Sequence, residues 1–314
     1  MSDADHDRES TIDHREFVAS LPAATRTRLQ QRSNAQGVLH LCSHLGAILL
    51  SGTLIYLRVP FWPAILPVHG VLLVFLFTLE HECTHMTPFR SRAINEWAGQ
   101  LAGLVILLPF RWFRYFHLAH HKYTNVPGKD PELLAGDRPE TVFQFLKYAS
   151  GTPALIGNAG TLVRNAFLPV TDSFVPDSAI PGIRREARMM LLTYAAVAGT
   201  ALTLPTDVLW LWLVPLCIGQ PFLRLYLLAE HGRCPFVTNM FENTRTTLTL
   251  WPVRWLSWNM PFHTEHHAVP NVPFYRLPEL HALAEPHLRV VEKGYVRFTG
   301  RYARSLSPRM RRTD

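Results

Sequence analysis

The sequence predicts an all-α integral membrane protein with four transmembrane helices in two hairpins, one interfacial helix and a cytosolic, histidine-rich cap. Three observations support this fold class. The apolar residues are gathered into long runs, the histidines fall into clusters at helical spacing, and the arginines crowd the termini and the edges of the apolar runs. The mean hydropathy of only +0.05 is compatible with membrane insertion, because it averages the apolar runs with charged segments.

Charge and cysteine content narrow the class of protein. The 314 residues carry a formal net charge of +7. Such a chain could bind nucleic acid, but no helix-turn-helix, zinc-finger or RNA-binding motif accompanies the charge, so contact with membrane lipids is the better interpretation. The four cysteines lie far apart without a Cys-x-x-Cys pair. We therefore expect a reducing compartment, with neither a disulfide framework nor a thiolate zinc site.

The first predicted hairpin follows a polar tail. Residues 1–34 lack the apolar core of a cleaved signal peptide, so we expect a cytosolic N-terminal tail. Apolar runs at about 37–57 and 61–79 each approach the ~20 residues that a bilayer core requires. The turn between them contains one arginine, whereas the tail contains several. The excess of positive charge places the amino terminus in the cytoplasm.

Residues 97–110 form a shorter apolar run of about 14 residues, a length typical of an interfacial helix. If this run crossed the bilayer, the histidine clusters on its two sides would face opposite compartments. We therefore expect it to lie at the membrane surface. The segment that follows, residues 111–116, alternates cations with aromatic side chains, as expected at the headgroup boundary.

The second predicted hairpin comes after a cytosolic insert at 122 to about 187. Its spans are expected at about 189–204 and 208–228. The membrane domain would then cover 35–281, and residues 282–314 would form a basic cytosolic tail, solvated or in contact with anionic lipid. Both termini and the histidine clusters are thus predicted on the cytoplasmic side.

The histidine clusters have the spacing of metal ligands. Two segments read His-x-x-His-His, which places three imidazoles on one face of a helix, and a further pair lies four residues apart. An even number of spans between the clusters brings them to one membrane face, together with one lone histidine. The nine predicted ligands are His81, His85, His117, His120, His121, His231, His263, His266 and His267.

Nine imidazoles are too many for one ion, so we expect two metal ions in the cap, with room for a small exogenous ligand. Imidazole binds iron, zinc and copper alike. A position beneath apolar spans favours iron that activates oxygen for oxidation of an unactivated hydrocarbon chain. The adjacent carboxylates of Glu82, Glu230 and Glu265 are candidates to orient imidazole N–H groups, whereas Asp130 and Glu132 are interpreted as loop and capping residues.

The remaining histidines are interpreted as structural. His40 and His44 lie four apart inside the first span and are expected to form interhelical hydrogen bonds. His69 lies in the middle of the second span, far along the helix from His81. His281 and His287 follow the last cluster and are expected at the surface.

The three clusters, His81-Glu-Cys-Thr-His85, His117-Leu-Ala-His-His121 and His263-Thr-Glu-His-His267, resemble the membrane-bound fatty acid desaturase superfamily, over roughly residues 37–281. The three-residue interval in the first cluster and the Ala229-Glu230-His231 segment are similar to the sphingolipid Δ4-desaturase branch. The resemblance implies a non-haem di-iron centre with histidine ligands, O2 as co-substrate, and an external electron donor such as a ferredoxin or a cytochrome b5-type carrier with its reductase.

The resemblance leaves open a further neighbour of the metals, and it suggests a reaction and contacts with the substrate. Acyl-CoA desaturases place an asparagine four residues before the lone histidine, and here that position is Leu227, so Asn259 becomes a candidate neighbour of the metals. The expected reaction is introduction of a double bond into a lipid acyl or long-chain-base chain. Candidate contacts with that chain are Trp112, Phe113, Tyr115 and Phe116.

Three other functions share part of this pattern. A di-iron lipid hydroxylase or carotenoid-type ketolase has the same ligands, and spacing does not separate it from a desaturase. A zinc-dependent membrane hydrolase would need neither oxygen nor reductant. A transporter or metal-binding membrane protein would carry polar residues through its spans, and these spans contain few.

Overall fold

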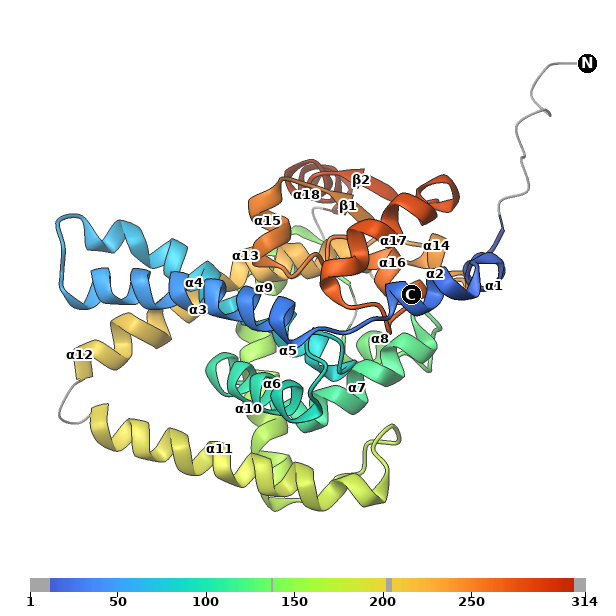
Figure 1. Ribbon diagram of the computed structural model, residues 1–314. Helices are drawn as coiled ribbons and strands as arrows, with labels where there is room; N and C mark the ends of the chain where they lie inside the picture. The colour runs from blue at the N-terminus through green and yellow to red at the C-terminus, as the bar shows by residue number, and fades with distance from the viewer. Residues whose placement is uncertain (1–11, 137, 202–204, 308–314) are drawn as a thin grey trace, which may run out of the picture.

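The computed structural model describes residues 12–136, 138–201 and 205–307, and this part of the chain is mostly helical (Figure 1). Its only sheet within those ranges is a parallel pair of three-residue strands, β1 (Thr246–Leu248) and β2 (Val291–Lys293). The predicted all-α class is therefore confirmed, apart from one small pair of strands.

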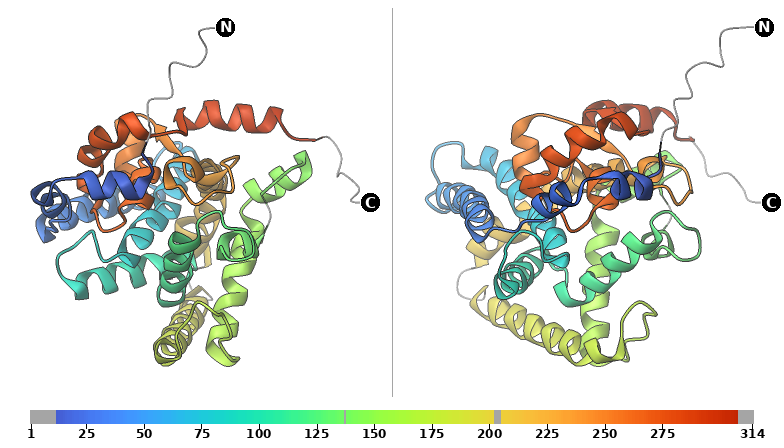
Figure 2. Two further views of the ribbon diagram at one scale, coloured as in Figure 1. Left: turned by 90° about the vertical axis from the view of Figure 1, so that its right-hand side faces the viewer. Right: turned by 45° about the vertical axis from the view of Figure 1, so that its right-hand side comes forward.

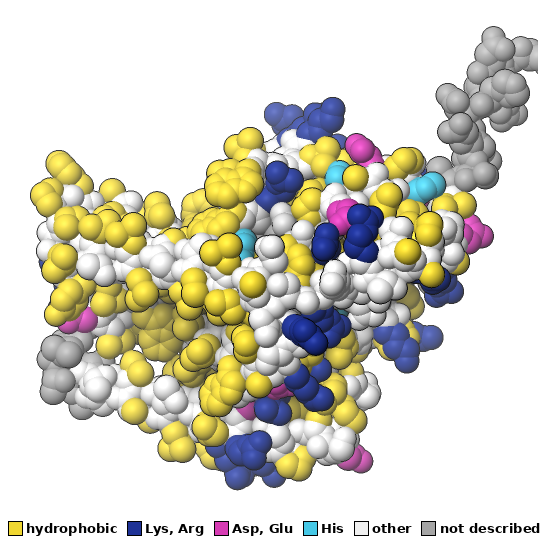
Figure 3. Space-filling model, in the orientation of Figure 1, with side chains coloured by type: hydrophobic (Ala, Val, Ile, Leu, Met, Phe, Trp, Pro, Cys, Tyr) yellow, Lys and Arg dark blue, Asp and Glu magenta, His cyan; other side chains and the backbone are white. Residues whose placement is uncertain are grey.

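The first hairpin forms an apolar arm. α3 (Asn34–Tyr56) runs out and the chain returns through the short η1 (Trp62–Ile65) into α4 (Leu66–Val74) and α5 (Leu76–Thr84), with α3 beside α4 (Figure 1). Hydrophobic side chains cover this arm, whereas most of the visible charged side chains lie on the rest of the molecule (Figure 3). Such a surface suits lipid rather than water.

Three segments of the described chain are long and apolar enough to cross a membrane, namely 23–56, 62–84 and 209–231. They contain nearly all of three predicted spans. The other prediction, 189–204, falls largely on α11 (Ile180–Ala201), and this helix does not meet the same test because charged residues occupy its first half. Residues 202–204 lie outside the described residues. Four spans therefore remain a prediction.

α6 (Arg92–Ile106) and α7 (Phe110–Tyr123) meet at a bend of 100°. α6 ends at Leu107, which adopts the left-handed conformation (φ 64°), and Pro109 precedes the first turn of α7. The predicted interfacial run 97–110 thus coincides with most of α6 and the bend. This turn in the chain directs α7 back along α5, with which it packs.

Histidines inside the arm hold irregular helix segments together. The His44 Nε2 lies 2.9 Å from the carbonyl oxygen of Leu72, close to the break between α4 and α5. The His69 Nε2 lies 3.0 Å from the carbonyl of Leu211, inside the π-helical turn η3 (Leu209–Leu213), where the regular α-helical ladder is interrupted. His40 Nε2 contacts the Trp255 carbonyl (2.9 Å). The predicted structural roles of these histidines are confirmed.

The cap is built from short helices on both sides of α13 (Val214–His231), and its core joins residues distant in sequence, such as Phe17, Phe110 and Leu277. α1 (His14–Ser20) and α2 (Ala23–Leu29) lie within the predicted N-terminal tail, and Phe17 packs on Phe241 with ring centroids 5.5 Å apart. The other helices of the described chain are α8 (Pro131–Ala135), α9 (Val142–Ala149), α10 (Thr152–Phe167), α12 (Pro205–Val208), α14 (Met240–Asn243), α15 (Trp251–Leu256), α16 (His263–Ala268), α17 (Leu277–Ala284) and α18 (Tyr295–Arg304). Three further 3-10 turns are η2 (Asp177–Ala179), η4 (Phe274–Arg276) and η5 (Glu285–His287).

The remaining helices divide between two sides of the molecule. α17 and α18 lie over the cap, and α10 and α11 extend away from it on the opposite side (Figure 2). α5, α7, α13 and α16 meet between these two sides. The elements that carry the predicted metal ligands therefore lie at the centre of the fold.

Candidate metal centre

All nine predicted histidines converge on one place. α5 supplies His81 and ends at His85, α13 ends at His231, and α7 and α16 each present three imidazoles on one face, as their spacing predicts. Eight of the nine are buried, and His85 at the end of α5 is partly exposed. Four separate elements thus concentrate imidazoles in the interior of the cap.

The nitrogens form two groups, each with ligand atoms within 4.8 Å of one another. His263 joins the smaller group, because its Nε2 lies 3.1 Å from the Nε2 atoms of both His231 and His267. The larger group contains His81, His85, His117, His121 and His266, and the smaller contains His120, His231 and His267 together with His263.

The ring nitrogens fit metal ligation. Both nitrogens of His81, His121 and His266 are buried without a hydrogen-bond partner in the described chain. Leaving such groups unpaired costs about 1–3 kcal/mol each, so a buried cluster of them requires compensation. A cation that accepts the lone pair of each imidazole would satisfy one of its two nitrogens, and two groups of imidazoles correspond to two ions.

Oxygen acceptors face the outer nitrogens of the smaller group. His120 Nδ1 lies 2.9 Å from Asp130 Oδ1, and His231 Nδ1 lies 3.3 Å from the Asn243 carbonyl oxygen. An N–H on Nδ1 leaves Nε2 free as an acceptor, and Nε2 is the atom that points into the cluster. The surroundings therefore select the tautomer that a metal ligand needs.

Asp130 has two roles, of which the sequence predicted one. It caps α8 by accepting the backbone N–H of Glu132 (2.9 Å), and it also accepts the N–H of Asn125 (2.8 Å). Burial opposes its ionised form, but the hydrogen bonds with His120 and with these amides hold the pKa of the Asp130 carboxyl below its usual value. Its position ten residues after a ligand histidine was the available signal for its contact with that histidine.

The three candidate glutamates behave differently. Glu82 Oε1 lies 3.5 Å from His266 Nδ1, and Glu230 Oε1 lies 3.5 Å from His263 Nδ1. Each therefore faces an imidazole of the last cluster rather than its own neighbour in sequence. Glu265 instead accepts the Thr246 hydroxyl (2.6 Å) and pairs with His281.

The Glu265 pair corrects the prediction for His281. This side chain is largely buried against Glu265 rather than free at the surface, and the hydrogen bond raises the pKa of His281 above its ordinary value. His287 is also packed, with its ring centroid 5.5 Å from that of Phe17. Glu265 and His281 hold α16 against α17, so their effect on the centre is indirect.

Three polar residues of the site were missed by the sequence reasoning. The Thr124 hydroxyl lies 3.1 Å from His267 Nδ1. The Asn243 side chain donates to the Thr124 carbonyl (3.1 Å), and Asn125 donates to the Asn243 carbonyl (2.6 Å). These bonds tie the end of α7 to the last residue of α14, more than a hundred residues later, and no local pattern marks such partners.

The predicted substrate and asparagine contacts are dispersed. Phe113 is buried and stacks on His117 with ring centroids 5.6 Å apart. Trp112 donates its indole N–H to Asp172 (3.0 Å) and stacks on Phe116, while Tyr115 lines a separate surface pocket. The Asn259 amide donates to the Phe274 carbonyl (3.0 Å). Of these residues, Phe113 is the one that packs on a ligand imidazole.

The sequence also matches known proteins over most of its length. The family model described as fatty acid desaturase matches residues 58–300. Similar proteins include a chloroplastic omega-3 fatty acid desaturase of Glycine max, 26% identical over 72% of this chain and 54% of the relative, and a sphingolipid delta(4)-desaturase/C4-monooxygenase of Mus musculus, 27% identical over 65% and 59%. An sn-1 oleoyl-lipid 12-desaturase of Picosynechococcus is 26% identical over 68% and 53%. The chain spans less than two thirds of the length of these relatives.

Proposed function

The chain belongs to the fatty acid desaturase family, and we propose that it is an O2-dependent di-iron oxidoreductase that introduces a double bond into a lipid acyl or long-chain-base hydrocarbon chain. The observation that carries this proposal is the convergence of nine histidines in two groups, in a chain with three segments that are long and apolar enough to cross a membrane. Oxidation of an unactivated chain requires such a combination, because the reactive metals and the lipid must meet in a site protected from water.

The histidines, the nearby carboxylates and the aromatic side chains would have separate roles in this reaction. The five-histidine group would hold one iron and the four-histidine group the other. Bound iron would supply the activation of O2 that removal of hydrogens from a saturated carbon requires. Asp130, Glu82 and Glu230 would orient imidazoles, and the buried aromatic surface around Phe113 would exclude water beside His117.

Hydroxylation is the second candidate. One of the similar proteins is named a sphingolipid delta(4)-desaturase/C4-monooxygenase, so the name of this relative covers both desaturation and insertion of oxygen. Removal of a second hydrogen and insertion of oxygen differ by small shifts of the chain against the metals. We favour desaturation because the last histidine cluster and its flank resemble desaturases more than ketolases.

The reaction is tested with the purified full-length protein. It is incubated with oxygen, a ferredoxin or cytochrome b5 with its reductase, and a lipid extract, and the products are analysed by mass spectrometry. Products lighter by two hydrogens are expected. A consistent gain of one oxygen atom would replace the desaturase by the hydroxylase, and elemental analysis that finds one zinc and no iron would favour the hydrolase.

We further propose that both termini and the metal centre lie on the cytoplasmic side, with four spans and α6 at the membrane surface. The arginine-rich N-terminal side and the shared site support this arrangement. The test is labelling of single cysteines at positions 31 and 207. Access to 31 from the cytoplasm and to 207 from the opposite side is expected, and access to both from one side would contradict it.

A further inference from the structure

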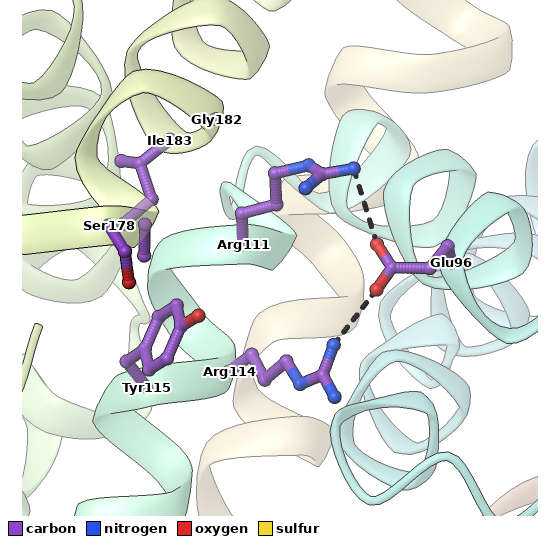
Figure 4. A pocket seen from close by; sticks show the side chains of 8 residues that line it. Glu96, Arg111, Arg114, Tyr115, Ser178, Gly182 and Ile183 are labelled. Carbon is purple, nitrogen blue, oxygen red and sulfur yellow. Dashed lines mark hydrogen bonds and ion pairs between the residues drawn. The ribbon is translucent and has the colours of Figure 1, made fainter. Parts of the chain in front are cut away.

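A pocket lies beside the metal centre and belongs to none of its groups. It is formed where α6, α7 and the beginning of α11 meet (Figure 4). Arg111 and Arg114 extend from α7 toward Glu96 of α6, and Tyr115 and Ser178 stand on the other side of the opening. Its lining is completed by Ala179, Gly182 and Ile183.

The pocket carries surplus positive charge. Arg114 Nη1 lies 2.8 Å from one oxygen of Glu96, and Arg111 Nη2 lies 3.4 Å from the other. Two guanidinium groups therefore share one carboxylate. Glu186 accepts the backbone N–H of Arg111 (2.8 Å) rather than its guanidinium, and burial raises the pKa of that carboxyl to about 7.

The donors in the pocket suit an oxyanion. Each guanidinium has five N–H donors in a planar fork, and the contacts with Glu96 use few of them. Both arginine side chains are partly shielded from water, which strengthens their attraction for an anion. Ser178 and Tyr115 add hydroxyl groups, and the N-terminal end of the 22-residue α11 adds its positive dipole.

Apolar side chains lie on the helices that form the pocket. On α6, Trp97 and Leu101 are 69% and 60% exposed, and on α11 Met189 and Leu192 are 60% and 70% exposed. A cationic pocket formed by helices that also expose apolar side chains matches an amphipathic ligand, with its anionic head in the pocket and its chains along the helices. A free anion would gain nothing from these side chains.

We propose that this pocket binds the phosphate headgroup of an anionic membrane lipid. Arg114 precedes the ligand His117 by three residues, about 4.5 Å of helix rise, so the headgroup would lie within a few turns of the metal centre. The ligand would be held by Arg111 and Arg114 in place of part of their contact with Glu96. Binding of this lipid is independent of the proposed oxidation, because no metal ligand takes part.

The test uses the full-length protein in a neutral detergent and isothermal titration calorimetry. The probes are dihexanoyl phosphatidic acid, dihexanoyl phosphatidylcholine and inorganic phosphate. Phosphatidic acid is expected to bind at least roughly tenfold more tightly than either of the other two, because only it joins a phosphate monoester to apolar chains. Inorganic phosphate that binds as tightly as phosphatidic acid would overturn the assignment to a lipid.

Three variants locate the site. Arg111→Gln and Arg114→Gln are each expected to weaken phosphatidic acid binding by roughly tenfold or more, since each removes charged hydrogen bonds. Glu96→Gln removes the competing carboxylate and should strengthen binding several-fold, which a misfolded protein would not do. Arg92→Gln changes the same charge on an exposed position of α6 and is the matched control. Equal affinities in the arginine variants and this control would overturn the proposal.

Discussion

The two histidine groups differ in what holds their imidazoles in place. In the four-histidine group every Nδ1 faces an oxygen of the protein, from Asp130, Glu230, Thr124 or the carbonyl of Asn243. In the five-histidine group one such contact is found in the described chain, between His266 and Glu82. The protein thus orients one set of ligands itself, whereas the other set depends more on the ion that it would bind.

Because of this difference, the two histidine groups should respond differently to substitutions of the residues around them. The imidazoles of the four-histidine group face partners at the end of α7, at the N-terminus of α8, on α13 and at the end of α14. Those in the five-histidine group are fixed mainly by the packing of α5 and α7, where buried nitrogens of His81 and His121 lack partners in the described residues. Variants outside the ligand set should therefore affect one half more than the other.

Replacement of a ligand histidine should have the largest effect, and the effect should be equal in the two histidine groups. His81→Ala and His120→Ala are both expected to abolish activity, because each would open one of the two proposed metal sites and the proposed oxidation would need both. Iron per chain, measured by elemental analysis of the purified protein, should fall in each. The control is fluorescence-detected gel filtration, which should show unchanged yield of the folded, membrane-extracted protein. Two irons retained in either variant would contradict the assignment of that histidine.

Loss of a carboxylate that orients an imidazole should lower the metal affinity of the two groups by different amounts. Asp130→Asn is expected to lower metal affinity at the four-histidine site by roughly 10- to 100-fold, since it removes the charged acceptor of the His120 N–H. The measurement is iron content during dialysis against a graded series of chelator concentrations.

Glu82→Gln is the matched change at the other group. Its carboxylate lies 3.5 Å from His266, farther than Asp130 lies from His120, so the expected loss of affinity is below tenfold. If this variant loses iron more readily than Asp130→Asn, the contrast between the two groups is wrong.

The smallest effect is expected for a single hydroxyl. Thr124→Val removes the oxygen that faces His267 Nδ1, a neutral partner whose loss should cost about 1 kcal/mol, or a few-fold in metal affinity. Thr193→Val is the matched control, because that hydroxyl bonds only within an exposed turn of α11. An equal response of the two variants in the chelator series would show that Thr124 does not orient its histidine.

Much of the centre could be predicted from the sequence. The i, i+3, i+4 spacing of His117, His120 and His121 fixes their common face on any helix. That the clusters lie on one side of the membrane was predicted by placing the run 97–110 at the membrane surface, and it stays a prediction. The lone His231 was found by the same argument. These features depend on helix periodicity and on the cost of exposing backbone to lipid, which act locally on the chain.

The tertiary structure alone decided which histidines share a group and which residues orient them. His120 separates from its neighbours His117 and His121 and joins His231, because adjacent positions on one helix diverge by about 100° and meet different partners. Asn243, at the end of α14, and Thr124, at the end of α7, are brought together over 119 residues by the tertiary fold, and nothing in either local segment encodes that contact. Spacing determines which way a side chain points, but its partner is determined by the element that packs opposite it.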